Sequence, residues 1–191
     1  MGDPTSCRSV PGDCRRVFSS LSSLVHTKED GEVMAVLLSL CLLANQNLEL
    51  TDYQHSNICK YEDTIRLEAQ RNSLDPALLA AVIYVESGFY KNVVSNAGAC
   101  GLTQVVPKWT GGPESMFTKY SCKQLKNPKS SIRVGAEILS YHIRVYAVGN
   151  VDKGLCYYNA GTKCITNKRY YKRLGYVKKV KRIYSLLSDD C

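Results

Sequence analysis

A glutamate occupies a position where the sequence pattern calls for an apolar side chain. Leu79, Val82 and Ile83 form the apolar stripe of one predicted helix, and the next position on that stripe is Glu86. A carboxyl group among aliphatic side chains is desolvated, and desolvation raises its pKa. A carboxylic acid that stays protonated near neutral pH is what cleavage of a glycosidic bond requires of a general acid. The pattern therefore predicts that Glu86 is a general acid.

The helix that positions this glutamate has clear start and stop signals. Asp75 is suited to the N-cap and Pro76 to the first helical position, while Gly88 is typical of the residue just after a helix. These signals predict a helix from about Pro76 to Ser87, with the acid in its last turn.

The remaining elements also follow a helical pattern. A helix ends near Asn72, another opens at Asn127-Pro128 and continues to Tyr146, and a basic helix runs from roughly Tyr170 to Leu187. A glycine-rich stretch covers residues 96–101, and residues 149–153 are predicted to form a loop. No internal repeat or convincing alternating strand pattern is visible, so the predicted fold class is mainly α.

Four short motifs around and after the glutamate stand in a fixed order: Glu86-Ser-Gly, Gly98-Ala-Cys-Gly-Leu-Thr-Gln104, Tyr158-Asn-Ala-Gly161 and Tyr176-Val-Lys-Lys-Val180. This set resembles the catalytic domain of soluble lytic transglycosylases, including the small ones attached to bacterial secretion systems and phage virions. The resemblance covers about residues 59–187. It implies a lysozyme-like helical domain, of the kind shared with goose-type lysozyme, around a glycan-binding groove.

The resemblance also implies roles for individual residues. Glu86 matches the sole catalytic acid/base, which cleaves between N-acetylmuramic acid and N-acetylglucosamine in peptidoglycan and closes a 1,6-anhydro ring without water. Ser95 and Gln104 match polar residues that face the sugar groove. Tyr158 matches the tyrosine whose hydroxyl sits against the catalytic carboxylate, and Asn159 shares its turn. The resemblance further implies that Tyr176, an aromatic residue of the closing segment, binds substrate.

Two positions depart from the pattern of that family. Thr103 stands where methionine is usual, which predicts a smaller and more polar groove floor. Tyr157 replaces the small residue that usually precedes the Tyr-Asn-Ala-Gly motif.

The spacing of the acidic residues bears on the type of reaction. A hydrolytic glycosidase normally needs a second carboxylate, as nucleophile or as base for water. After Glu86 no Asp or Glu occurs until Glu114, whereas goose-type lysozymes, which hydrolyse, tend to place an aspartate in that interval. The interval favours the transglycosylase route, with a hydrolytic goose-type muramidase as the alternative.

Composition narrows the class of protein and its environment. The chain has 191 residues, nine cysteines and a formal net charge of +8, which favours contact with a polyanion such as an acidic wall polymer. Six cysteines lie from Cys59 onward, and this even set suits an exported domain with disulfides, although free, buried cysteines are the alternative. Neither a metal site nor a cofactor is predicted.

The N-terminal part is predicted to be separate from the catalytic domain, which we place at residues 55–191. Residues 1–32 are predicted to be a poorly ordered segment. Residues 33–48 contain an apolar run of about twelve residues, too short for a stable membrane span of roughly 20. This run is either the core of a signal peptide or a short packed helix. The expected location is the periplasm or another wall-facing site, reached by export, by a secretion machine or in a phage particle.

Three other functions compete with this interpretation. Residues 163–182 carry nine basic residues, no acid and several tyrosines, a mixture that can bind nucleic acid, although a solvated helix face is the usual meaning. A catalytically silent glycan-binding or structural virion component is the second. A nucleophilic pair of Cys100 and His142 is the third, and their spacing does not support it; His142 is expected to be a packed or surface residue.

Overall fold

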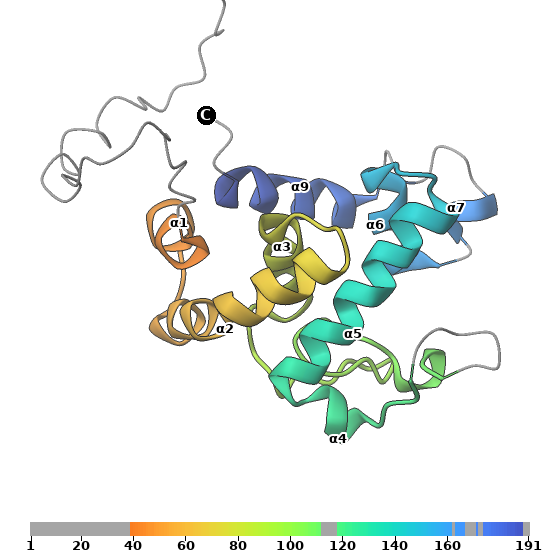
Figure 1. The fold of residues 1–191 in the computed structure, drawn as a ribbon, viewed down its shortest axis with the longest axis horizontal. Coiled ribbons are helices and arrows are strands. Elements are labelled where there is room, and N and C mark those ends of the chain that lie inside the picture. The colour runs from red at the N-terminus through yellow and green to blue at the C-terminus, as the bar shows by residue number, and fades with distance from the viewer. Residues whose placement is uncertain (1–38, 112–117, 162, 167–170, 172–173, 189–191) are drawn as a thin grey trace, which may run out of the picture. The chain divides into compact units, whose positions relative to one another are not determined.

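The structure is a computed structural model, and it describes residues 39–111, 118–161, 163–166, 171 and 174–188. These residues form helices, joined by a loop that contains isolated β-bridges (Figure 1). The helical elements are α1 (Leu40–Asn47), α2 (Asp52–Arg71), α3 (Pro76–Ser87), η2 (Pro107–Trp109), α4 (Cys122–Leu125), α5 (Pro128–Tyr141), η3 (His142–Tyr146), α6 (Val151–Ala160), α7 (Lys163–Thr166) and α9 (Gly175–Leu187). The mainly α fold class is confirmed.

Helix α3 is the central helix of the described part, and its bounds are those predicted. Asp75 takes the N-cap position, where its carboxylate accepts a hydrogen bond from the Ala77 amide at 2.7 Å. Every residue from Ala77 to Ile83 is buried, because α3 packs against α2 on one side and α9 on another (Figure 1). Gly88 ends the helix with a left-handed backbone, φ +58°, which glycine adopts without steric cost.

Helices α1 and α2 pack against each other and are joined by a short connection, residues 48–51. Thr51 and Gln54 form a capping box at the start of α2. Helix α2 ends at Arg71, with Asn72 as its C-cap, as the sequence predicts. Helix α1 lies inside the apolar segment 33–48 and buries Leu40, Leu43 and Ala44. Residues 40–47 of this segment therefore form a helix that packs on the rest of the described domain.

Helix α5 continues into a turn of π-helix, η3, before the chain reverses into α6. The Asn127 side chain caps α5 by accepting from the Ser130 amide at 3.2 Å. Helix α6 begins at Val151, inside the segment predicted to be a loop, because Asn150 provides an N-cap that accepts from the Lys153 amide at 2.9 Å. Helix α6 packs against η3, α9 and α5.

The last helix, α9, begins at Gly175, directly after Leu174, whose backbone angles are extended (φ −66°, ψ 117°). Tyr170, where the sequence places its start, lies outside the described residues. The apolar face of α9, Val177, Val180, Ile183 and Leu187, is buried as the sequence pattern predicts.

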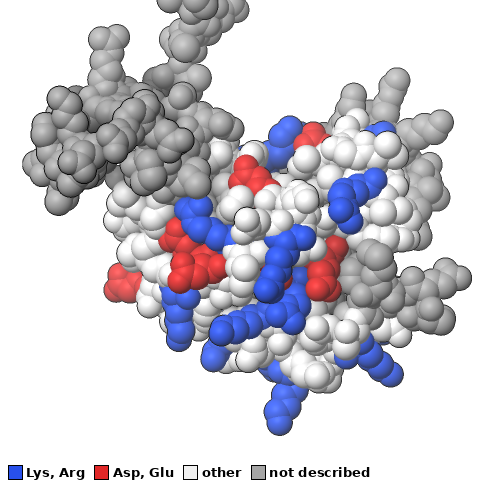
Figure 2. Space-filling view, in the orientation of Figure 1, with Lys and Arg blue, Asp and Glu red and all other residues white. Residues whose placement is uncertain are grey.

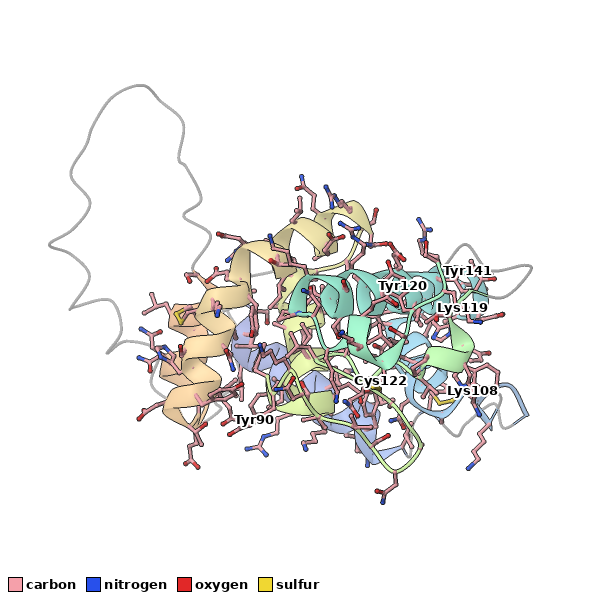
Figure 3. All side chains as sticks on the ribbon, turned by 90° about the horizontal axis from the view of Figure 1, so that it is seen from below. Tyr90, Lys108, Lys119, Tyr120, Cys122 and Tyr141 are labelled. Atoms are coloured by element: carbon pink, nitrogen blue, oxygen red, sulfur yellow. A yellow bond between two sulfur atoms is a disulfide. The ribbon has the colours of Figure 1, made fainter. Side chains whose placement is uncertain are left out.

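Residues 88–106 form a folded loop between α3 and the segment that leads into α4. Two isolated bridges, Val94 with Cys100 and Cys100 with Val105, hold the loop together. Gly101 (φ +79°) packs directly on α4, where an added Cβ would lie 1.9 Å from the Leu125 carbonyl oxygen. Figure 3 labels Tyr120 and Cys122, where the chain enters α4.

Three disulfides join the described elements: Cys41–Cys59 links α1 to α2, Cys100–Cys122 links the loop to α4, and Cys156–Cys164 links α6 to α7. The even set of cysteines from Cys59 onward therefore does not pair within itself, since Cys59 pairs with Cys41. Cys7, Cys14 and Cys191 lie outside the described residues, as does the predicted N-terminal segment 1–32.

None of the helices in the described part of the chain is long and apolar enough to cross a membrane.

Candidate active site

The candidate active site is centred on Glu86, in the last turn of α3. The side chain is half-buried, and burial raises the pKa of its carboxyl group from the ordinary 4.5 to about 7. At neutral pH the group therefore exists in comparable amounts as acid and as carboxylate. That is the condition in which one residue can give a proton and later take one back.

Two half-buried tyrosines face this carboxyl group from different helices. Tyr176 comes from the first turn of α9 and Tyr158 from α6. Burial raises the pKa of both phenols, and the negative charge of Glu86 raises them further. Both phenols consequently remain protonated and can act only as neutral hydroxyl groups beside the acid.

Tyr176 is the tyrosine that interacts directly with the carboxyl group. Burial has the larger effect and raises the Glu86 pKa. The interaction with the Tyr176 hydroxyl stabilises the carboxylate and lowers the pKa by a smaller amount. In the described residues the Tyr176 hydroxyl has no partner at full hydrogen-bond geometry, so its contact with Glu86 is a loose one. The hydroxyl is thus placed to strengthen its bond when the carboxylate forms.

Tyr158 lies near Glu86 and is hydrogen-bonded to the loop. Its hydroxyl donates to the Thr103 carbonyl oxygen at 2.7 Å, while its ring stays close enough to Glu86 for their charges to interact. Tyr158 therefore connects α6 to the loop, and Tyr176 is the tyrosine that interacts with the Glu86 carboxyl group.

The Ser87 side chain links the loop, residues 88–106, to the last turn of α3 by a hydrogen bond. Its buried hydroxyl lies 3.1 Å from the Ile83 carbonyl oxygen and 2.8 Å from the Leu102 carbonyl oxygen, and it donates toward both. The segment Leu102–Gln104 is therefore held directly beside the turn that carries Glu86. Sequence reasoning listed Ser87 in a motif but gave it no role.

The predicted substrate residues Ser95 and Gln104 have structural bonds within the loop. The Ser95 hydroxyl accepts from the Ala99 amide at 3.0 Å. The Gln104 amide nitrogen donates to the carbonyl oxygens of Val93 and Gly101, at 3.1 and 2.8 Å. Both side chains remain partly exposed, so they shape the loop and still reach its surface. Asn159 is exposed in the last turn of α6.

Thr103 does not lie on an exposed groove floor. It is fully buried, its hydroxyl donates to the Ser131 carbonyl oxygen at 2.8 Å, and its amide donates to the Ser131 hydroxyl at 3.2 Å. Gly135 leaves the space for it, since a Cβ there would lie 2.5 Å from the Thr103 side chain. The expectation of a more polar groove floor is therefore wrong, because the threonine is bonded inward to α5.

An aromatic cluster beside Tyr158 was not anticipated from the sequence. The rings of His142, Tyr146 and Tyr157 pack within 6.3 Å of one another, centroid to centroid, and His142 packs edge-on to Tyr158 at 6.3 Å. Burial lowers the pKa of His142 to about 4, so the ring is neutral at neutral pH. His142 is thus a packed residue. Cys100 is held in its disulfide, which leaves no free thiol for a nucleophilic pair.

Comparison with known proteins places this arrangement in a family. The family model described as "Transglycosylase SLT domain" matches residues 63–179. The chain is 38% identical over 78 residues to the endo-type membrane-bound lytic murein transglycosylase A of Klebsiella pneumoniae, covering 35% of each protein. It is 27% identical over 135 residues to the membrane-bound lytic murein transglycosylase C of Histophilus somni, covering 65% of this chain and 37% of that protein. The chain thus spans little more than a third of the length of these relatives.

Solved structures share the fold. The 70 kDa soluble lytic transglycosylase of Escherichia coli superposes with a TM-score of 0.55 at 18% identity, over 78% of this chain and 29% of that one. An inactive variant of the lytic transglycosylase Slt of Pseudomonas aeruginosa gives a TM-score of 0.52 at 22% identity, over 75% of this chain and 26% of that one. Since the family model covers more than half of the chain and includes Glu86, the protein belongs to the transglycosylase SLT domain family.

Proposed function

We propose that the protein is a peptidoglycan lytic transglycosylase in which Glu86 is the only catalytic acid and base. The observation that carries the proposal is the Glu86 carboxyl group itself, buried to a pKa of about 7 between two protonated tyrosines. The lytic murein transglycosylases among its relatives support the substrate class.

The proposed reaction uses the two protonation states of Glu86 in turn. Protonated Glu86 gives its proton to the oxygen that links N-acetylmuramic acid to N-acetylglucosamine, and the bond from this oxygen to the muramoyl C1 breaks. The carboxylate then takes the proton of the muramoyl C6 hydroxyl, whose oxygen bonds to C1. The Tyr176 hydroxyl stabilises the carboxylate between these steps. The 1,6-anhydro product forms without water, and Glu86 ends protonated as it began.

Mass spectrometry of muropeptides tests the reaction type. Digestion of purified peptidoglycan is expected to release chains that end in 1,6-anhydro-N-acetylmuramic acid. Reducing ends, which are heavier by one water, would instead support the hydrolytic goose-type muramidase. No release at all, with binding to the wall retained, would support a silent glycan-binding component.

Substitution of the acid tests the site. Glu86→Gln is expected to lower activity by at least about 1000-fold, because proton transfer in both steps is lost. Glu137→Gln is a matched control, since burial also raises the Glu137 pKa on α5, where Arg133 and Glu68 are its charged neighbours. This control is expected to keep full activity, and an active Glu86→Gln variant would disprove the assignment.

The pH dependence follows from the same group. A general acid works in its protonated form, so kcat/KM is expected to fall about tenfold per pH unit above pH 7. A profile that stays flat up to pH 9 would contradict an acid with a pKa of about 7.

We further propose that the enzyme opens the wall locally for a larger assembly, a secretion machine or a phage particle, at a periplasmic or wall-facing site. The resemblance to small transglycosylases of such assemblies supports this role, and the disulfides suit an oxidising compartment. Antibodies against the chain should detect it in purified particles or secretion complexes of its source. Detection only as a free protein would contradict the role.

A further inference from the structure

A cluster of metal-binding side chains lies where α1 meets α2. The Nε2 atom of His55 is 3.8 Å from the Cys41 sulfur and 3.6 Å from the Cys59 sulfur. All three side chains are half-buried, so solvent and small ions reach them. The ligand atoms of the three side chains all lie within 4.8 Å of one another. Among the described His, Cys, Asp and Glu residues, this is the group that could hold one metal ion.

The fold positions the three residues in two ways. His55 and Cys59 are four residues apart on α2, so they share one face of that helix. Cys41 is in the first turn of α1, which is held against α2 by its buried apolar residues.

The position of α1 does not depend on the Cys41–Cys59 disulfide alone. The Glu62 carboxylate on α2 accepts hydrogen bonds from the Ser39 hydroxyl and from the Leu40 and Cys41 amides, at 2.5, 3.0 and 3.2 Å. At its other end, the Asn47 side chain donates to the Leu186 carbonyl oxygen at 3.0 Å. Reduction of the disulfide would therefore leave Cys41 facing His55 and Cys59.

The observed spacing fits tetrahedral zinc. Zinc–sulfur bonds of about 2.3 Å and zinc–nitrogen bonds of about 2.0–2.1 Å, at tetrahedral angles, put sulfur and nitrogen ligands about 3.5 Å apart. The two measured distances from Nε2 to sulfur, 3.6 and 3.8 Å, are close to this value. Once the disulfide bond is broken, rotation of a cysteine side chain about its Cα–Cβ bond brings the two sulfurs to their own zinc spacing of about 3.8 Å.

We propose that Cys41, His55 and Cys59 bind one Zn²⁺ ion when the disulfide is reduced. A dithiol reductant transfers two electrons and two protons to the disulfide and is itself oxidised to a disulfide. Zinc then displaces the two thiol protons, binds both thiolates and the neutral imidazole, and keeps one water as its fourth ligand. The same three side chains hold α1 to α2 by a covalent bond in oxidising conditions and by a metal in reducing conditions.

The ligand set decides the class of metal. Two thiolates and an imidazole are soft and borderline ligands, which zinc prefers and which magnesium and calcium do not. Cobalt(II) has the same tetrahedral preference in such sites and serves as the coloured probe for zinc.

Metal titration of the full-length chain tests the proposal. The protein is produced in a reducing cytoplasm, purified without oxygen, checked for helix content by circular dichroism and titrated with Co²⁺ and then Zn²⁺. One equivalent of Co²⁺ is expected to give the intense visible and near-ultraviolet bands of thiolate ligation, and one equivalent of Zn²⁺ is expected to remove them. The oxidised protein is expected to give no such bands.

Matched variants distinguish this site from metal binding by other cysteines. Cys59→Ser is expected to abolish the bands, and His55→Ala to weaken zinc binding at least about tenfold. Cys156→Ser/Cys164→Ser removes two cysteines elsewhere and is expected to leave one equivalent bound. The proposal is overturned if Cys59→Ser or His55→Ala binds zinc like the parent, or if the reduced chain with zinc is unfolded or metal-free. None of these outcomes bears on Glu86.

Discussion

At the scale of single residues, Glu86 lowers the stability of the fold that carries it. Its pKa is about 7 in the folded protein, against an ordinary value of 4.5. The folded state thus holds the proton more tightly than the unfolded state. As pH rises from 4.5 to 7 the unfolded state alone becomes charged, so stability falls, and the loss amounts to about 3 kcal/mol above pH 7.

The Glu86→Gln variant should reveal this loss. Glutamine has nearly the same shape and no charge. At pH 8 the free energy of unfolding of the variant is therefore expected to be about 2–3 kcal/mol higher than that of the parent. Near pH 4.5 the difference should be small, because the parent's carboxyl group is then protonated in the folded state and still about half protonated in the unfolded state. Urea unfolding of both proteins at the two pH values measures it, and a difference that does not change with pH would contradict the burial of this carboxyl group.

At the scale of elements, the hydrogen bond from the Ser87 hydroxyl on α3 to the Leu102 carbonyl oxygen holds the loop beside Glu86. The Ser87→Ala variant loses the bond to the Leu102 carbonyl oxygen and leaves that buried oxygen without a donor. Its free energy of unfolding is expected to be about 1–2 kcal/mol lower than that of the parent. Its activity is expected to fall because the loop is no longer fixed beside Glu86.

An exposed serine provides the control for that experiment. The Ser185 hydroxyl on α9 donates to the Arg182 carbonyl oxygen at 2.9 Å, the same kind of bond within a helix but without a loop partner. Ser185→Ala is expected to change stability by less than about 0.5 kcal/mol and activity not at all. Equal effects of the two substitutions would show that the Ser87 bond to the loop has no special importance.

The elements that local rules define could be predicted from the sequence. Asp75, Pro76 and Gly88 determine the bounds of α3 through capping and backbone preferences that act within a few residues. The start of α6 at Val151 was missed, although Asn150 is itself a capping residue, because the surrounding glycines indicated a loop.

The site around Glu86 could be predicted only in part. The apolar stripe of α3 predicts the raised pKa, because that shift depends on burial. The partner of each tyrosine depends on how three helices and the loop meet, and no spacing in the sequence encodes it. For the same reason the inward bonding of Thr103 to Ser131 and the pairing of Cys41 with Cys59 could not be foreseen.

At the scale of the whole molecule, positive charge is concentrated around the loop and α4. Between residues 88 and 136 the described part of the chain contains basic side chains and no acidic one: Lys91, Lys108, Lys119, Lys123, Lys126, Lys129 and Arg133. Figure 2 shows Lys and Arg without Asp or Glu on the part of the visible face around α4. Such a surface attracts an anionic polymer at low ionic strength.

A single exposed lysine tests this attraction. Lys129→Glu is expected to weaken binding to peptidoglycan about 2–5-fold at roughly 0.02 M salt and to have no effect near 1 M, where screening acts within about 3 Å. Lys60→Glu makes the same charge change on α2, beside Glu62 and Asp63, and should have a smaller effect. Sedimentation with purified sacculi measures both. A loss that persists at high salt would contradict an electrostatic cause.

The place of Glu86 near the carboxyl end of α3 has a consequence for the direction of proton flow. The aligned peptide dipoles of a helix give its last turn a partial negative charge, which opposes a carboxylate there. The dipole therefore acts in the same direction as burial, the main cause of the raised pKa. In the proposed reaction, once Glu86 has given its proton away, the helix it belongs to favours the return of a proton. The acid would thereby be restored for the next bond, and the backbone of α3 would contribute to turnover as well as to the placement of the side chain.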